Sequence, residues 1–143
     1  MLDQEKPKEP FVFLSYCRED EKKVERLADD LSRAGLNVWW DHCILPGQDW
    51  QHEIRNAIKN CAAFILCVSE AVHAKPTSGV HSEIRGAIDQ HELRPPGSTY
   101  LQIVRLSSCN VPDYDIFDQL QHVDLFPEGE RSRNIPKLIQ ALH

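Results

Sequence analysis

Apolar and polar positions along this chain fall into blocks that predict strands and helices in turn. Runs that are apolar at nearly every position are typical of parallel strands covered on both faces. The strongest run is 62–69, and 11–16 is similar, while the other runs are shorter or less apolar. The pattern predicts strands at 11–16, 36–40, 62–69, 100–106 and 122–126.

Between these runs, apolar residues recur three or four positions apart, which is the spacing of one helix face. Asp20 is a suitable N-cap for the first helix, and Gly35 ends it. Asp49 and Asn134 are suitable N-caps for the second and last helices. The predicted apolar faces are Val24, Leu27, Ala28 and Leu31; Trp50, Ile54, Ala57 and Ile58; Val80, Ile84, Ala87 and Ile88; and Leu138, Ile139 and Leu142.

Strict alternation of strand and helix predicts a doubly wound α/β domain with a mostly parallel sheet. The 143 residues are enough for one such domain. We expect residues 1–10, which are charged and contain proline, to be a disordered leader, and 11–143 to form the domain. The chain stops directly after the last predicted helix, which leads us to expect a domain taken from a longer protein.

Charge and hydropathy narrow the class of protein. A net charge of −6 without a cluster of Lys and Arg argues against a nucleic-acid surface. The longest apolar run, 61–68, is too short to span a membrane, and the polar N-terminus has no signal-peptide core. We therefore expect a cytoplasmic protein that contacts neither nucleic acid nor membrane.

The five cysteines contain no CxxC pair, which argues against a disulfide framework and against a zinc site. Cys61 and Cys67 accompany the strongest apolar run, so we expect them to be buried as small hydrophobic residues. Cys17 follows the first strand, but no base partner is visible that would make it a nucleophile. The chain also has no GxGxxG, P-loop or HExxH motif.

Three blocks, taken in order, resemble the TIR (Toll/interleukin-1 receptor) domain family, and its bacterial branch more than its animal receptor branch. The first is 11–20, a strand ending in Ser15-Tyr16 before a charged loop. The second is 38–50, which is similar to the family's BB loop and contains Ile44, Leu45, Pro46 and Gly47. The third is 64–69 followed by 80–84. The resemblance implies a flavodoxin-like three-layer sandwich with a five-stranded parallel sheet in the order 2-1-3-4-5.

Some TIR domains are signalling adaptors that only assemble, and others hydrolyse or cyclise NAD+. The Val80-His-Ser-Glu-Ile84 segment is similar to the one that carries the essential glutamate of NAD-cleaving members, which makes Glu83 the catalytic candidate. An animal NAD-cleaving member has Trp four residues before its glutamate, where this chain has Gly79. From spacing alone, such a glutamate is usually a solvated partner of the helix dipole. His81, two residues away, is expected at the surface.

The implied strand order places a ligand crevice between the first and third strands. Arg18 enters it from one side and is expected to bind a diphosphate oxygen, although a surface ion pair is an alternative. Trp50 or Tyr16 would stack on a base or close the ribose pocket, and core packing is the alternative for Trp50. Asp41 would order the BB loop or contact substrate.

One carboxylate is chemically sufficient for this reaction. Ordinary glycosidases need a second acid to protonate an alkoxide leaving group. Nicotinamide already carries a positive charge in NAD+ and leaves as a neutral ring. Glu83 alone can therefore hold the ribose hydroxyls and stabilise the developing positive charge, with NAD+ as substrate and no cofactor or metal.

We therefore expect an NAD+ nucleosidase that releases nicotinamide and ADP-ribose or a cyclic isomer. The resemblance implies that it is activated when the BB loop of one TIR protomer docks on the next, and a head-to-tail contact of this kind builds filaments. An effector of bacterial immune defence, working with a sensor outside this chain, fits by analogy. The alternative is a non-catalytic adaptor for TIR–TIR signalling, which would not need a carboxylate at position 83.

Overall fold

The sheet has the strand number and order that the resemblance implies. The computed structural model describes residues 10–40, 50–74, 79–95 and 97–143. Within them, five parallel strands form one sheet in the order β2-β1-β3-β4-β5. The strands are β1 Phe11–Ser15, β2 Asn37–Trp39, β3 Ala63–Val68, β4 Leu101–Arg105 and β5 His122–Asp124. The predicted fold class is confirmed.

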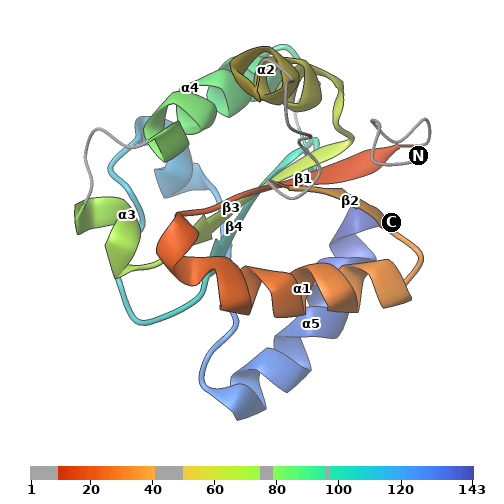
Figure 1. Cartoon of the computed structure of the whole chain (residues 1–143), viewed down its shortest axis with the longest axis vertical. Helices are drawn as coiled ribbons and strands as arrows, with labels where there is room; N and C mark the ends of the chain where they lie inside the picture. The colour runs from red at the N-terminus through yellow and green to blue at the C-terminus, as the bar shows by residue number, and fades with distance from the viewer. Residues whose placement is uncertain (1–9, 41–49, 75–78, 96) are drawn as a thin grey trace.

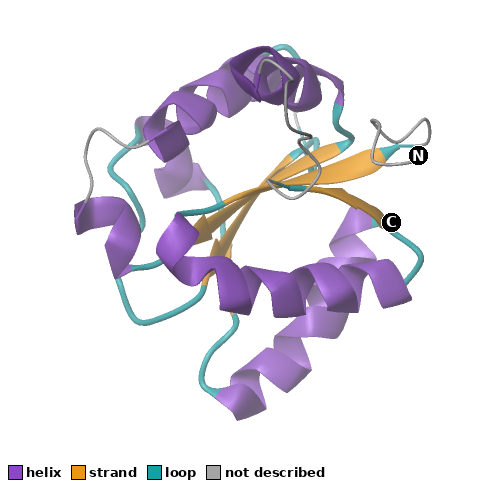
Figure 2. Ribbon diagram, in the orientation of Figure 1, coloured by secondary structure: helices purple, strands orange, loops and turns teal. Residues whose placement is uncertain are grey.

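Helices cover both faces of this sheet (Figures 1 and 2). One face packs against α1 (Glu21–Arg33) and α5 (Glu128–Leu142), and the other packs against α2 (Trp50–Asn60) and α4 (Gly79–Glu92). A short helix, α3 (Glu70–Ala74), precedes α4, and two 3-10 turns complete the described elements, at Arg18–Asp20 and Asp115–Gln119. The five-residue α3 is too short to show a helical period, so the sequence did not predict it.

Alternate residues of β1 build two separate cores. Phe11 and Phe13 pack in the core under α2 and α4, whereas Val12 and Leu14 pack in the core under α1 and α5. Phe13 lies stacked between Trp39 of β2 and Phe64 of β3, with ring centroids 5.1 Å apart on each side. This alternation decides which face each residue at the end of β1 can reach.

Two of the predicted helix caps do not act as such. Asp20 occupies the N-cap position of α1 but makes no capping hydrogen bond with its side chain. Asn134 lies inside α5, which begins at Glu128, seven residues earlier than an N-cap at Asn134 implies. The sequence was misleading because asparagine is a preferred N-cap residue, whereas here its side chain bonds the Asp124 carbonyl and the helix accommodates Pro136 in its interior. The third, Asp49, lies outside the described residues.

Gly35 does end α1 as expected. Its φ of 89° lies in the left-handed region that glycine adopts without strain. The amide of Leu36 bonds back to the carbonyl of Leu31, which closes the end of the helix.

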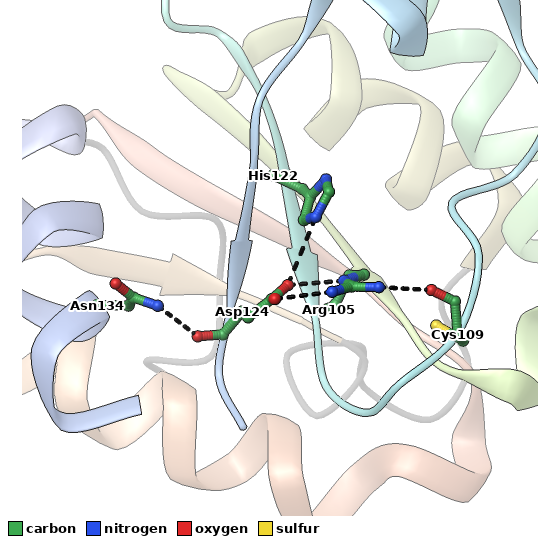
Figure 3. Close-up of polar contacts among 5 residues, drawn as sticks. All are labelled: Arg105, Cys109, His122, Asp124 and Asn134. Atoms are coloured by element: carbon green, nitrogen blue, oxygen red, sulfur yellow. Dashed lines mark hydrogen bonds and ion pairs between the residues drawn. The ribbon is translucent and has the colours of Figure 1, made fainter. Parts of the chain in front are cut away.

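A polar network joins the ends of β4 and β5 (Figure 3). Arg105 makes two hydrogen bonds of 2.7 Å to the Asp124 carboxylate and a third, of 2.8 Å, to the Cys109 carbonyl. Asn134 donates to the Asp124 carbonyl at 2.8 Å, which ties α5 to β5. The bond from Arg105 lowers the pKa of Asp124 below its usual value. This network is part of the scaffold and keeps the edge strand in place.

The cysteines behave as the sequence predicted where the structure describes them. Cys17, Cys61 and Cys67 are buried. Burial raises the pKa of the Cys61 thiol to about 11, and it raises the pKa of Cys67 as well. Thiols that stay protonated at neutral pH are poor nucleophiles, so both serve as core residues.

In the part of the chain that the structure describes, no helix has the length and apolar composition needed to cross a bilayer.

Candidate active site

The carboxyl ends of β1 and β3 form the topological switch point of the sheet. The chain leaves β1 toward α1 on one face and leaves β3 toward α3 and α4 on the other. In open α/β sheets a ligand binds in the crevice outside such a point, because connections diverge from it to opposite faces. The sequence-predicted candidate, Glu83, lies on α4, which follows β3 and the short α3.

Ser15 and Glu83 meet at this point. The Ser15 hydroxyl, from the last residue of β1, donates a hydrogen bond of 2.6 Å to Oε1 of Glu83. Ser15 is buried, and it shares the strand face of Phe11 and Phe13, which is the face that α4 covers. Glu83 is half-buried. The bond holds one carboxylate oxygen at the strand end.

A second polar pair joins the loops on the two sides of the switch point. The Ser69 hydroxyl, just after β3, donates to Oδ2 of Asp20 at 2.5 Å, and both residues are buried. The same hydroxyl accepts a bond of 3.1 Å from the amide of Ala71 in α3. Asp20 therefore ties the turn after β1 to the start of α3 and does not cap its own helix.

The surface position expected for His81 is wrong. The imidazole is half-buried, with Nε2 3.3 Å from the Val72 carbonyl and Nδ1 3.4 Å from the Tyr114 hydroxyl. These contacts link α4 to α3 and to the connection between β4 and β5. Tertiary contacts from two other segments bury a ring that helix periodicity alone places outside.

A groove runs between α2 and α4 and reaches Glu83. It has a volume of about 500 Å³, and Ile54, Ile58 and Gly86 are among its apolar lining. Gln51, Ser82 and Glu83 lie toward the N-terminal ends of the two helices, and Arg55, Lys59, Asp89 and Gln90 lie further along them. Small-molecule sites have volumes in this range.

The structure brings only part of the predicted site together. Arg18 is exposed on the 3-10 turn that follows β1, at the same sheet edge as Ser15. Tyr16 is buried in the other core, with its ring 5.9 Å from that of Trp40, so it does not meet Glu83. Strand alternation explains this, because Tyr16 follows Ser15 and points to the opposite face.

The remaining predicted site residues lie outside what the structure describes. α2 begins at Trp50, whose side chain is not among the described parts. The predicted BB-loop positions Asp41, Ile44, Leu45, Pro46 and Gly47 also lie outside the described residues.

Sequence reasoning did not single out Ser15 as a site residue, although a signal was present. Its side chain shares the face of Phe11 and Phe13, and it is a polar residue at the end of an otherwise apolar strand. A hydroxyl there must find a partner when it is buried. Only the position of α4 identifies that partner as Glu83.

Similar structures of known proteins share this fold. A TIR domain of a Toll-related receptor from Hydra magnipapillata is 18% identical, with a TM-score of 0.74 over 92% of this chain and 96% of that one. A CMP N-glycosidase from Clostridium botulinum is 25% identical, with a TM-score of 0.58 over 89% and 95%. A TIR-STING receptor from C. gigas is 23% identical, with a TM-score of 0.64 over 95% of this chain and 42% of that one.

The comparison with curated proteins gives no match. The sequence model of the TIR domain family matches residues 12–139. This match covers nearly the whole sheet and its helices, and the strand order agrees with it. The chain therefore belongs to the TIR domain family.

Proposed function

We propose that this TIR domain cleaves the N-glycosidic bond between nicotinamide and ribose in NAD+, with Glu83 as the essential carboxylate. The observation that carries the proposal is the hydrogen bond of 2.6 Å from Ser15 to Glu83 at the switch point of the sheet. It fixes the position of the carboxylate at the strand end, where the substrate would bind. A carboxylate that only balances the helix dipole needs no such buried partner.

In the proposed reaction, the bond between C1′ of the ribose and N1 of nicotinamide breaks, and its electron pair goes to N1. The pyridinium becomes neutral nicotinamide, and positive charge develops on the ribose. Glu83 stabilises this charge and accepts hydrogen bonds from the ribose hydroxyls. Water then adds to C1′ and releases a proton to solvent, which gives ADP-ribose; attack by an adenine nitrogen instead would give a cyclic isomer.

The similarity to a CMP N-glycosidase supports the reaction class. That protein is 25% identical over 89% of this chain, and its name states cleavage of an N-glycosidic bond. The bond in NAD+ belongs to the same class, a ribose C1′ joined to a ring nitrogen. The family resemblance supplies the choice of NAD+ over CMP.

The other parts of the proposal rest on the resemblance to NAD-cleaving TIR domains. Arg18 would hold a diphosphate oxygen, while Trp50 and Asp41 would line the ribose pocket. The BB loop, Ile44 to Gly47, would dock on a second TIR protomer and switch the enzyme on. A cytoplasmic effector of bacterial immune defence is the biological role that fits such an assembly-dependent enzyme, with a sensor supplying the signal.

The test is NAD+ consumption by the protein at high concentration or on a crowding surface. We expect the wild type to release nicotinamide and Glu83→Ala to release none. Glu92→Ala is the matched control, because Glu92 is an exposed carboxylate at the far end of the same helix. Equal turnover by wild type and Glu83→Ala would overturn the role of Glu83.

Two other outcomes would support a different substrate or a non-catalytic role. Release of cytosine from CMP without loss of NAD+ would keep the reaction class and change the substrate. No cleavage of either compound in demonstrably assembled protein would favour the non-catalytic adaptor.

A further inference from the structure

We infer that the groove between α2 and α4 binds the adenosine diphosphate half of the substrate, with Arg55 and Lys59, in place of Arg18, holding the phosphates. This inference rests on the proposed function for the identity of the substrate. The groove would be a second binding region that extends from Glu83 along α2 and α4, and it would make the enzyme prefer dinucleotides to smaller substrates.

The groove begins where the proposed chemistry takes place. Glu83 is among its lining residues, so a ribose held by that carboxylate leads directly into it. Gln51, Arg55 and Lys59 are spaced four residues apart on α2, so the two cations follow at steps of about 6 Å along the helix axis. A diphosphate attached to the reacting ribose would meet them in turn.

Both cations are available for a ligand. Arg55 and Lys59 are exposed, and among the described residues neither has a carboxylate within ion-pair distance. Arg105 and Arg131, by contrast, are held by the carboxylates of Asp124 and Asp30. Two cations that no described carboxylate pairs lie along one groove wall, and they can hold phosphate oxygens although Glu83 and Asp89 also line the groove.

The floor and the opposite wall suit a nucleoside. Ile54 and Ile58 are buried and offer an apolar surface to the flat face of a base. Asp89 and Gln90 line the groove from α4. The Asp89 carboxylate can accept bonds from ribose hydroxyls or a base amino group, whereas Oε1 of Gln90 accepts a bond of 3.5 Å from Arg94. An acceptor wall opposite a cationic wall matches a ligand with phosphates on one side and donors on the other.

Gly86 keeps this groove open. A Cβ at position 86 would lie 3.7 Å from the nearest atoms of Ile58, which is an ordinary contact, so packing does not demand glycine there. Glycine inside a helix costs about 0.5–1 kcal/mol relative to alanine. Its effect at this position is to leave space between the two helices.

The test is calorimetric titration of the full chain with ADP-ribose, which needs no turnover. We expect Arg55→Gln/Lys59→Gln to weaken binding about a hundredfold, since each lost charge-assisted contact weakens it about tenfold. Lys22→Gln/Arg33→Gln is the matched control, because it removes the same charges from exposed positions of α1 on the other face of the sheet. We expect the control to stay within threefold of wild type.

A steric pair of variants tests the groove without changing charge. Gly86→Leu should abolish ADP-ribose binding by filling the space, and Gly86→Ala should keep it. Thermal melts of every variant check that folding is intact. An affinity for ADP-ribose that both the cation pair and Gly86→Leu leave unchanged, or no binding by wild type at millimolar ADP-ribose, would overturn the inference.

Kinetics separate this inference from the proposed function. Nicotinamide riboside has the reacting bond but neither phosphate, so the cation variant should raise KM for NAD+ and leave KM for the riboside unchanged. NAD+ cleavage with an unaltered KM in that variant would contradict binding in the groove but would agree with the proposed NAD+ cleavage. If the protein binds ADP-ribose in the groove but leaves NAD+ intact, the binding site would be supported and the proposed NAD+ cleavage would be wrong.

Discussion

Ser15 reaches Glu83 from the last position of β1, across 68 residues of sequence, with a hydrogen bond of 2.6 Å. The strand supplies a rigid base, because both of its neighbours in the sheet hold it in register. A catalytic group works best when a second layer of contacts locks its rotamer. We therefore regard Ser15 as a positioning residue for the proposed reaction.

Replacing Ser15 by Ala should lower kcat for NAD+ about tenfold and leave KM within twofold. Losing the bond lets the Glu83 side chain change rotamer but removes no contact with the substrate. A tenfold drop in kcat corresponds to about 1.4 kcal/mol, which is close to the net contribution of a hydrogen bond to a charged group. Steady-state kinetics of assembled protein measure both constants. Ser15→Thr keeps a hydroxyl and should restore most of kcat; equal loss in Ser15→Thr and Ser15→Ala would contradict a role for the hydroxyl.

Much of the fold is predictable because the strands are apolar and their spacing is regular. The strand order follows from the family resemblance, and the core face of each helix follows from periodicity. The predicted start of the last helix was wrong because a tertiary contact, and not the local sequence pattern, decides the role of Asn134. Asn134 was predicted to be an N-cap because of its residue type, yet it lies inside α5 and its amide donates to the carbonyl of Asp124.

The site was predictable at the level of elements and less so at the level of contacts. The sequence placed Glu83 correctly on the helix after β3, since that helix has a clear apolar face. It did not anticipate that Asp20 would bond across to Ser69, because the partner lies 49 residues away. Tyr16 was grouped with the site by proximity in sequence, while strand alternation sends it to the opposite core.

The pair of Asp20 and Ser69 should show strong coupling in a double-mutant cycle. Ser69→Ala leaves a buried carboxylate without this donor and should lower the free energy of unfolding by about 1–3 kcal/mol. Once Asp20 has been replaced by Ala, the same serine substitution should cost much less, with a coupling of about 1–2 kcal/mol. Urea denaturation of the four proteins measures it, and additive effects would show that the bond contributes nothing to stability.

Asp124→Asn should destabilise the protein at neutral pH and have little effect in acid. Arg105 lowers the pKa of Asp124 in the folded state, so the ionised carboxylate stabilises the fold above the pKa of the unfolded chain. This contribution disappears as the pH falls through the lowered folded pKa. With Arg105 and Asp124 both part-exposed, we expect a difference of about 1–2 kcal/mol at pH 7.

Denaturant unfolding of wild type and Asp124→Asn at pH 7 and near pH 3 tests this prediction. The gap between the two proteins should narrow toward the lower pH. His122 Nε2 lies 3.7 Å from the same carboxylate, so His122→Ala in both backgrounds is the control for its charge. A gap of constant size across this range would mean that the Asp124 charge is not the source of the stability.

Two glycines should respond in opposite directions to alanine. Gly86→Ala should raise the free energy of unfolding by about 0.5–1 kcal/mol, because the helix gains propensity and the new Cβ meets Ile58 at an ordinary 3.7 Å. Gly35→Ala should lower it by about 1 kcal/mol or more, because a φ of 89° is strained for any residue with a Cβ, although open space surrounds that position. Thermal and urea unfolding of both variants give the signs. Stabilisation by Gly86→Ala would mean that the packing of α2 on α4 does not require glycine at this position, whereas destabilisation would mean that it does.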